Sequence, residues 1–149
     1  MASAAGAAGW ICPGCKRRFR RQRQAHSCQV VSLDAHLDRA TPAARAAFHA
    51  ILAALRAQGP LDVVPTRSGI NLLSGTSLGS MAFRKDGVEL GLLLTRKLEH
   101  PRVRGVLQLS PRSFHHRFRI GAAREVDPEL TGWLAEAHAV GRMAGRRLR

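Results

Sequence analysis

The sequence predicts an α+β domain with a mainly antiparallel sheet, preceded by a short segment of different character. Helical apolar patterns begin near residue 41 and after residue 127, and about five or six short apolar or alternating runs lie between them. Only turn residues separate most of these runs, which favours antiparallel pairing because a parallel partner needs a long crossover. The predicted order is therefore one principal helix, a meander of strands and a second principal helix.

The first principal helix is predicted between Thr41-Pro42 and Gly59-Pro60. Threonine is a good N-cap, proline suits the first helical position, and glycine followed by proline ends a helix. Residues 30–40, just before it, are expected to form a connector with a single helical turn at residues 32–35. The helix has one apolar stripe at helical spacing, made of Ala44, Phe48, Ile51, Leu52 and Leu55.

Turn residues delimit the strands. Asp86-Gly87 between two apolar runs indicates a hairpin, because glycine accepts the positive φ of a tight turn. Asp127-Pro128 then opens the last helix as N-cap and first residue. Residues 30–149 together form a domain long enough to bury its own core and to fold alone. The strands are expected at residues 61–64, 69–73, 77–84, 88–94, 103–109 and 114–120.

Four residues near the N-terminus have the spacing of a metal site. They form Cys-x-x-Cys, ten intervening residues and His-x-Cys, and the chain has no other cysteine. Three thiolates and one imidazole complete a tetrahedral set for Zn²⁺ and leave no open position for catalysis. We expect a structural zinc knuckle at residues 10–29 after a disordered leader at residues 1–9. Its ligands are Cys12, Cys15, His26 and Cys28.

Two alternatives to zinc stay open. One is a surface cysteine pair with an unrelated histidine and cysteine. The other is redox chemistry at Cys-x-x-Cys, which is less favoured because that motif belongs between a strand and a helix in a βαβ unit. An odd number of cysteines argues against a disulfide framework, and thiols stay reduced in the cytoplasm. With no apolar run long enough for a membrane helix, we expect a protein of a bacterial-type cytoplasm.

The charge is strongly positive. The 149 residues hold 24 Lys and Arg against 10 Asp and Glu, a formal net charge of +14. Such a balance favours a polyanionic partner, most simply nucleic acid, because guanidinium groups bind phosphate in a bidentate way. The alternative is a solvated charged face. Six cations and no acid lie between the two ligand pairs: Lys16, Arg17, Arg18, Arg20, Arg21 and Arg23.

The strand predicted at residues 114–120 carries a second basic cluster. Alternation directs Phe114, His116, Phe118 and Ile120 to the core. His116 is then expected to be a core histidine with its hydrogen bonds satisfied rather than a catalyst. The opposite face is either a polar sheet face or a ligand site, and it carries His115, Arg117 and Arg119.

No motif indicates a reaction. The Gly/Ser/Thr-rich stretch at residues 69–79 lacks the Gly-Lys-Ser/Thr of a phosphate-binding loop. No pair of carboxylates suits acid–base chemistry, and no nucleophile has a local partner. The sequence therefore predicts a binding protein. The alternative hypothesis is a small-molecule module or enzyme that uses an Arg/His face for an anionic ligand.

Two resemblances add to these predictions. The Cys-x-x-Cys half, with Trp10 before it and Phe19 after it, resembles the hairpin of a Cys2His2 zinc finger, whereas the tight His26-Ser27-Cys28 departs from that family. Most of residues 10–140 resemble a bacterial domain-of-unknown-function family, number fifty-six fifty-five. The resemblance is carried by the Cys/His segment and by Pro65-Thr66, Pro101-Arg102, Leu109-Ser110-Pro111-Arg112-Ser113 and Asp127-x-Glu129-Leu130-x-x-Trp133-Leu134. It implies an α+β body, no established activity and one anion-binding face shared by Arg96, Arg112, His116 and Arg119.

Overall fold

A computed structural model describes residues 9–13, 18–19, 21–23 and 32–147. The contacts divide the chain into two units, residues 1–31 and residues 32–149, and each is described by itself. In the first unit, β1 (Trp10–Ile11) pairs antiparallel with β2 (Arg18–Phe19), with Trp10 opposite Phe19.

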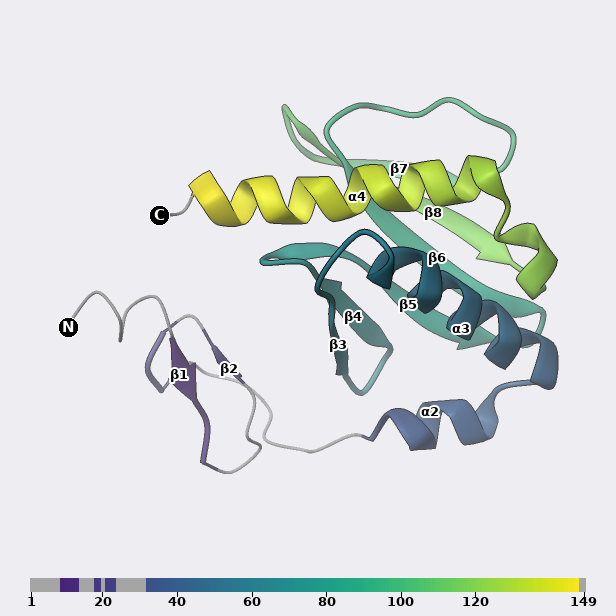
Figure 1. Ribbon diagram of the computed structural model, residues 1–149, viewed down its shortest axis with the longest axis horizontal. Coiled ribbons are helices and arrows are strands. Elements are labelled where there is room, and N and C mark those ends of the chain that lie inside the picture. Colours follow the sequence, from purple (N-terminus) through teal and green to yellow (C-terminus); the bar gives the residue numbers. More distant parts are fainter. Residues whose placement is uncertain (1–8, 14–17, 20, 24–31, 148–149) are drawn as a thin grey trace. The chain divides into compact units, whose positions relative to one another are not determined.

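The second unit, called the body, confirms the predicted α+β class. Its helices are α2 (Leu33–Arg39), α3 (Pro42–Arg56), the short 3₁₀ helix η1 (Ala123–Glu125) and α4 (Pro128–Arg147) (Figure 1). All neighbouring strands of its sheet pair antiparallel, in the order β3-β4-β5-β6-β8-β7. The strands are β3 (Asp62–Pro65), β4 (Ile70–Leu73), β5 (Ser77–Arg84), β6 (Gly87–Leu94), β7 (Gly105–Ser110) and β8 (Ser113–Ile120).

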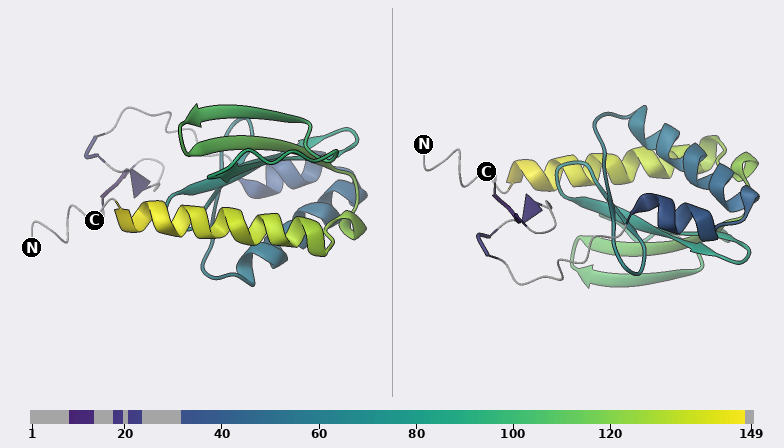
Figure 2. Two further views of the ribbon diagram at one scale, coloured as in Figure 1. Left: turned by 90° about the horizontal axis from the view of Figure 1, so that it is seen from above. Right: turned by 90° about the horizontal axis from the view of Figure 1, so that it is seen from below.

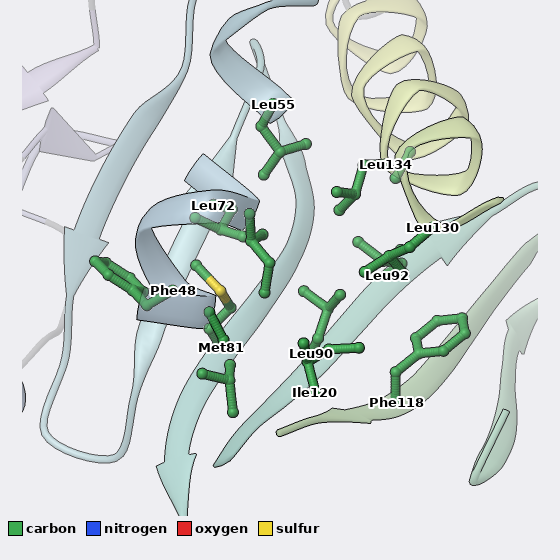
Figure 3. Packing of buried hydrophobic residues seen from close by; sticks show 14 of the residues in the cluster. Phe48, Leu55, Leu72, Met81, Leu90, Leu92, Phe118, Ile120, Leu130 and Leu134 are labelled. Atoms are coloured by element: carbon green, nitrogen blue, oxygen red, sulfur yellow. The ribbon is translucent and has the colours of Figure 1, made fainter. Parts of the chain in front are cut away.

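The core lies between one face of this sheet and the two long helices. Figure 2 shows α3 and α4 on the same side of the sheet. The apolar stripe predicted for α3 is buried, and Leu130, Trp133, Leu134 and Ala137 bury one side of α4. Figure 3 shows side chains from both helices converging on those of β4, β5, β6 and β8. Burial of this apolar surface is the main stabilising term for the body.

Side-chain caps fix where the long helices begin. The Thr41 hydroxyl accepts a hydrogen bond from the Ala44 N–H at 3.1 Å, and the Asp127 carboxylate accepts one from the Leu130 N–H at 3.0 Å. Each bond satisfies a backbone donor that the first turn of a helix leaves unpaired.

The segment before α3 is more helical than its sequence predicts. A single turn is expected at residues 32–35, but α2 continues to Arg39. The Ser32 hydroxyl caps it by accepting from the Ala35 N–H at 3.1 Å, and Leu33 and Leu37 pack partly buried against the core. Leucines four residues apart share one helix face, so tertiary packing extends a turn that local signals leave short.

The second face of the sheet carries mainly polar and small side chains, together with Leu93 and Leu107 in the row of His115. Along β8, His116, Phe118 and Ile120 are buried with the core, whereas Arg117 on the other face is exposed. This confirms the alternation predicted for residues 114–120. We call the second face, which α3 and α4 leave uncovered, the open face. No helix in the described part of the chain is long and apolar enough to cross a membrane.

Candidate functional site

The hairpin of the first unit is built around two aromatic rings. The centroids of Trp10 and Phe19 lie 5.9 Å apart, and Cys12, directly after β1, is only 4% exposed. Of the four expected zinc ligands, Cys12 alone lies within the described residues, and Cys15, His26 and Cys28 lie outside them. Across the residues that the structure describes, no group of three or more His, Cys, Asp or Glu side chains is placed to hold a metal.

Some arginines of this segment lie within the described residues and others lie outside them. Arg18 on β2, together with Arg21 and Arg23, is described and exposed. Arg17 and Arg20 lie outside the described residues.

His116 is a buried residue with a structural role on β8. It is fully buried, and its Nε2 accepts a hydrogen bond from the Leu98 N–H at 2.8 Å. Its Nδ1 lies 3.1 Å from the Phe114 carbonyl, so Nδ1 carries the proton of a neutral ring. Burial lowers the pKa of His116, which keeps the ring neutral. The histidine thereby fastens the loop of residues 95–104 to β8.

Arg96 lies in that loop and faces α4. Its Nε and Nη2 donate to the two carboxylate oxygens of Glu136, both at 3.0 Å, and this pair raises the pKa of Arg96. The Arg96 side chain is 52% exposed, so the pair contributes about 0–1 kcal/mol. Arg96 therefore meets a carboxylate on the covered side of the sheet.

Arg119 lies on the open face of β8, opposite Glu89 of β6. It pairs with Asp86 in the β5–β6 turn and with Glu89, whose carboxylate is 3.3 Å away. Arg112 lies in the β7–β8 turn and is exposed. The structure therefore does not bring Arg96, Arg112, His116 and Arg119 onto one face. Positions 116 and 119 are an odd number of residues apart on one strand, so their side chains leave opposite faces of the sheet.

The open face instead contains a groove of about 260 Å³. Its floor follows a row across neighbouring strands, in which Asn71 lies opposite Ser80, Ser80 opposite Gly91, and Gly91 opposite Arg117. The groove is lined by Thr66, Ser68, Gly69, Ile70, Asn71, Ser80, Met81, Ala82, Arg84, Glu89, Gly91, His115 and Arg117.

Gly91 makes room for the imidazole of His115. A Cβ atom added at Gly91 would lie 2.3 Å from His115 Nε2, so the ring rests where any other residue would place its side chain. Burial lowers the pKa of His115, and the nearby Arg117 lowers it further, against an opposing effect of Glu89. The groove thus has a neutral histidine as part of its wall.

Three charged side chains define the electrostatics of the groove. Arg84 lies 3.5 Å from a carboxylate oxygen of Glu89, and Glu89 is also the partner of Arg119. Arg117 is exposed and forms no ion pair with any described residue. One guanidinium of the groove is therefore available to an anion.

The sequence predicted that His115 and Arg117 share a face of the sheet, but it did not predict which other residues line the groove beside them. Asn71, Ser80, Arg84 and Gly91 come from β4, β5 and β6, and only the register between strands brings them beside β8. A local signal exists in β5, where Ser80, Ala82 and Arg84 alternate with apolar residues, as on a strand with one polar face.

A separate charged cluster anchors the N-terminus of α4. Arg102 pairs with Asp127 at 2.9 Å and with Glu129 at 3.2 Å, and donates to the Glu125 carbonyl at 2.7 Å. Its guanidinium carbon lies 5.9 Å from the ring centroid of Trp133. The hydrogen bond from the Leu130 N–H is the main cause that lowers the pKa of Asp127, and the hydrogen bond from Arg102 lowers it further. These groups satisfy one another, so we assign the cluster a structural role.

Comparison with known proteins identifies a family for the body. A family model described as a domain of unknown function, DUF5655, matches residues 33–141. The chain belongs to this family. The matched region begins with α2, so the Cys/His segment precedes it. No curated protein and no solved structure matches the chain.

Proposed function

We propose that this DUF5655 protein is a non-catalytic binding protein that contacts a polyanion, most simply nucleic acid, through its N-terminal segment. The observation that carries the proposal is the aromatic hairpin. Trp10 and Phe19 pair beside a buried Cys12, within a segment that holds six cations and no acid. A basic segment of this size contacts phosphates through charge rather than base sequence.

Zinc completes the proposal. A segment of some 20 residues has almost no core, and two short strands with one aromatic pair are marginal without further support. Zinc held by Cys12, Cys15, His26 and Cys28 would supply that support, since structural zinc in finger peptides contributes about 10–16 kcal/mol of apparent binding free energy near neutral pH. Buried Cys12 in the hairpin suits a thiolate ligand. We expect the protein to act in the cytoplasm, where such thiolates stay reduced.

Two measurements test this function. Metal analysis of protein purified without chelator is expected to find one zinc per chain, and Cys15→Ser is expected to lose it. A protein without zinc whose three thiols all react freely would contradict the metal site.

Binding is measured by fluorescence anisotropy with labelled duplex DNA and RNA in low salt. We expect binding at micromolar protein and weaker binding by a variant with Arg17, Arg18, Arg20 and Arg21 replaced by alanine. A control variant loses four exposed arginines of the body, Arg39, Arg56, Arg124 and Arg142, and so the same charge. Equal weakening in both variants would show that net charge, and not this segment, governs binding. Absence of binding by the wild-type protein would overturn the nucleic-acid proposal.

A further inference from the structure

The groove of the open face contains polar groups that lack partners. The side chains of Ser68, Asn71 and Ser80, and the guanidinium of Arg117, form no hydrogen bond with the described residues. They come from the β3–β4 turn, from β4, from β5 and from β8. Polar groups that converge on one concavity are what a bound small molecule would satisfy.

The charges restrict the ligand. Arg117, which forms no ion pair with the described residues, favours an oxyanion, and a guanidinium fork matches phosphate oxygens in a bidentate way. Glu89 lies in the same groove and accepts hydrogen bonds without donating any. Glu89 is already paired with Arg84 and Arg119, so the ligand part beside it is expected to carry hydrogen-bond donors such as hydroxyl groups rather than a second anionic group.

The size of the groove further restricts which ligands can bind there. At about 260 Å³ it is slightly smaller than the sites that hold drug-sized ligands. The His115 ring resting on Gly91 forms part of its wall, and Asn71 and Ser80 add an amide and a hydroxyl. We propose that the groove binds a small phosphate ester that also carries hydroxyl groups, with its phosphate at Arg117 and its hydroxyls toward Glu89.

Ribose 5-phosphate is a suitable probe, with inorganic phosphate and ribose as its two halves. Calorimetric titration of the full chain is expected to show tighter binding of ribose 5-phosphate than of either half. Arg117→Gln is expected to weaken it about tenfold or more, because the lost hydrogen bonds are charge-assisted. Arg56→Gln removes the same charge from an exposed position on α3 and is expected to leave the affinity unchanged.

Glu89→Gln tests the hydroxyl part of the proposal. It is expected to reduce the advantage of ribose 5-phosphate over inorganic phosphate while the affinity for inorganic phosphate holds or rises. If Glu89→Gln prefers ribose 5-phosphate over inorganic phosphate as strongly as the wild type does, the proposed placement of the hydroxyl groups toward Glu89 is wrong.

This site is independent of the function proposed for the N-terminal segment. The variant without Arg17, Arg18, Arg20 and Arg21 is therefore expected to bind ribose 5-phosphate as the wild type does, even where it no longer binds DNA. Two results would overturn the groove site: no binding of ribose 5-phosphate by the wild-type chain, or equal weakening by Arg117→Gln and Arg56→Gln.

Discussion

Single side chains of the body are fixed by partners that lie far away in the sequence. His116 accepts from Leu98, eighteen residues earlier, and Arg96 pairs with Glu136, forty residues later. The core position of His116 was predictable from alternation along its own strand. The partners of Arg96 and Arg119 were not, because they depend on which elements meet. For that reason His116 and Arg119, which were expected to share one anion-binding face, lie on opposite faces of the sheet.

The stability of the protein is expected to fall in mild acid in part because of His116. Burial holds its folded-state pKa below the ordinary value of about 6.5, so the unfolded state takes up a proton more readily. Its contribution is complete above about pH 6.5 and is lost as the pH falls toward the folded-state pKa, with a slope of at most about 1.4 kcal/mol per pH unit. Urea unfolding at a series of pH values between 7.5 and 5 measures this slope.

His116→Gln is expected to reduce the slope, because glutamine can accept from the Leu98 N–H without titrating. His49→Gln, at an exposed position of α3, serves as the control and should keep it. If wild type and His116→Gln lose stability in parallel, the buried histidine is not the source of the acid sensitivity.

At the scale of elements, the sequence predicted where glycine and proline act but not how strands are ordered. Gly87, predicted in the β5–β6 turn, has a φ of 140°, and the two strands meet there with Arg84 opposite Gly87. Each strand was predicted to within about two residues. The order β6-β8-β7 was not predicted. After the loop of residues 95–104, β7 pairs with β8 at the edge of the sheet, and β8 rather than β7 pairs with β6. Local patterns contain no information on that choice.

Helix α3 is expected to depend on its buried stripe. Leu52→Ala removes a side chain that is 4% exposed between α3 and the sheet, and should lower the free energy of unfolding by about 2–5 kcal/mol. Leu109→Ala, on a side chain that is 56% exposed, should change it by about 0.5 kcal/mol or less. Chemical denaturation of both variants measures the difference, and a Leu52→Ala cost as small as that of Leu109→Ala would show that the site repacks.

At the scale of the molecule, two units of different character lie along one chain. The body has a core that draws on both long helices and the sheet, whereas the described part of the hairpin contains the aromatic pair of Trp10 and Phe19. Residues 30–149 are therefore expected to fold without the first 29 and to unfold cooperatively on heating. Circular dichroism of the truncated chain tests this. A broad, non-cooperative transition would show that the body needs the N-terminal segment.

The salt dependence of nucleic-acid binding tests the central claim most directly. If the arginines of residues 17–23 neutralise phosphates, the logarithm of the binding constant for duplex DNA falls linearly with the logarithm of the salt concentration, with a slope of about 0.9 per phosphate. Replacing Arg17, Arg18, Arg20 and Arg21 with alanine should flatten the slope and weaken binding to unrelated sequences alike, with zinc retained. A slope that these four substitutions leave unchanged would contradict the proposal that the segment contacts the phosphate backbone.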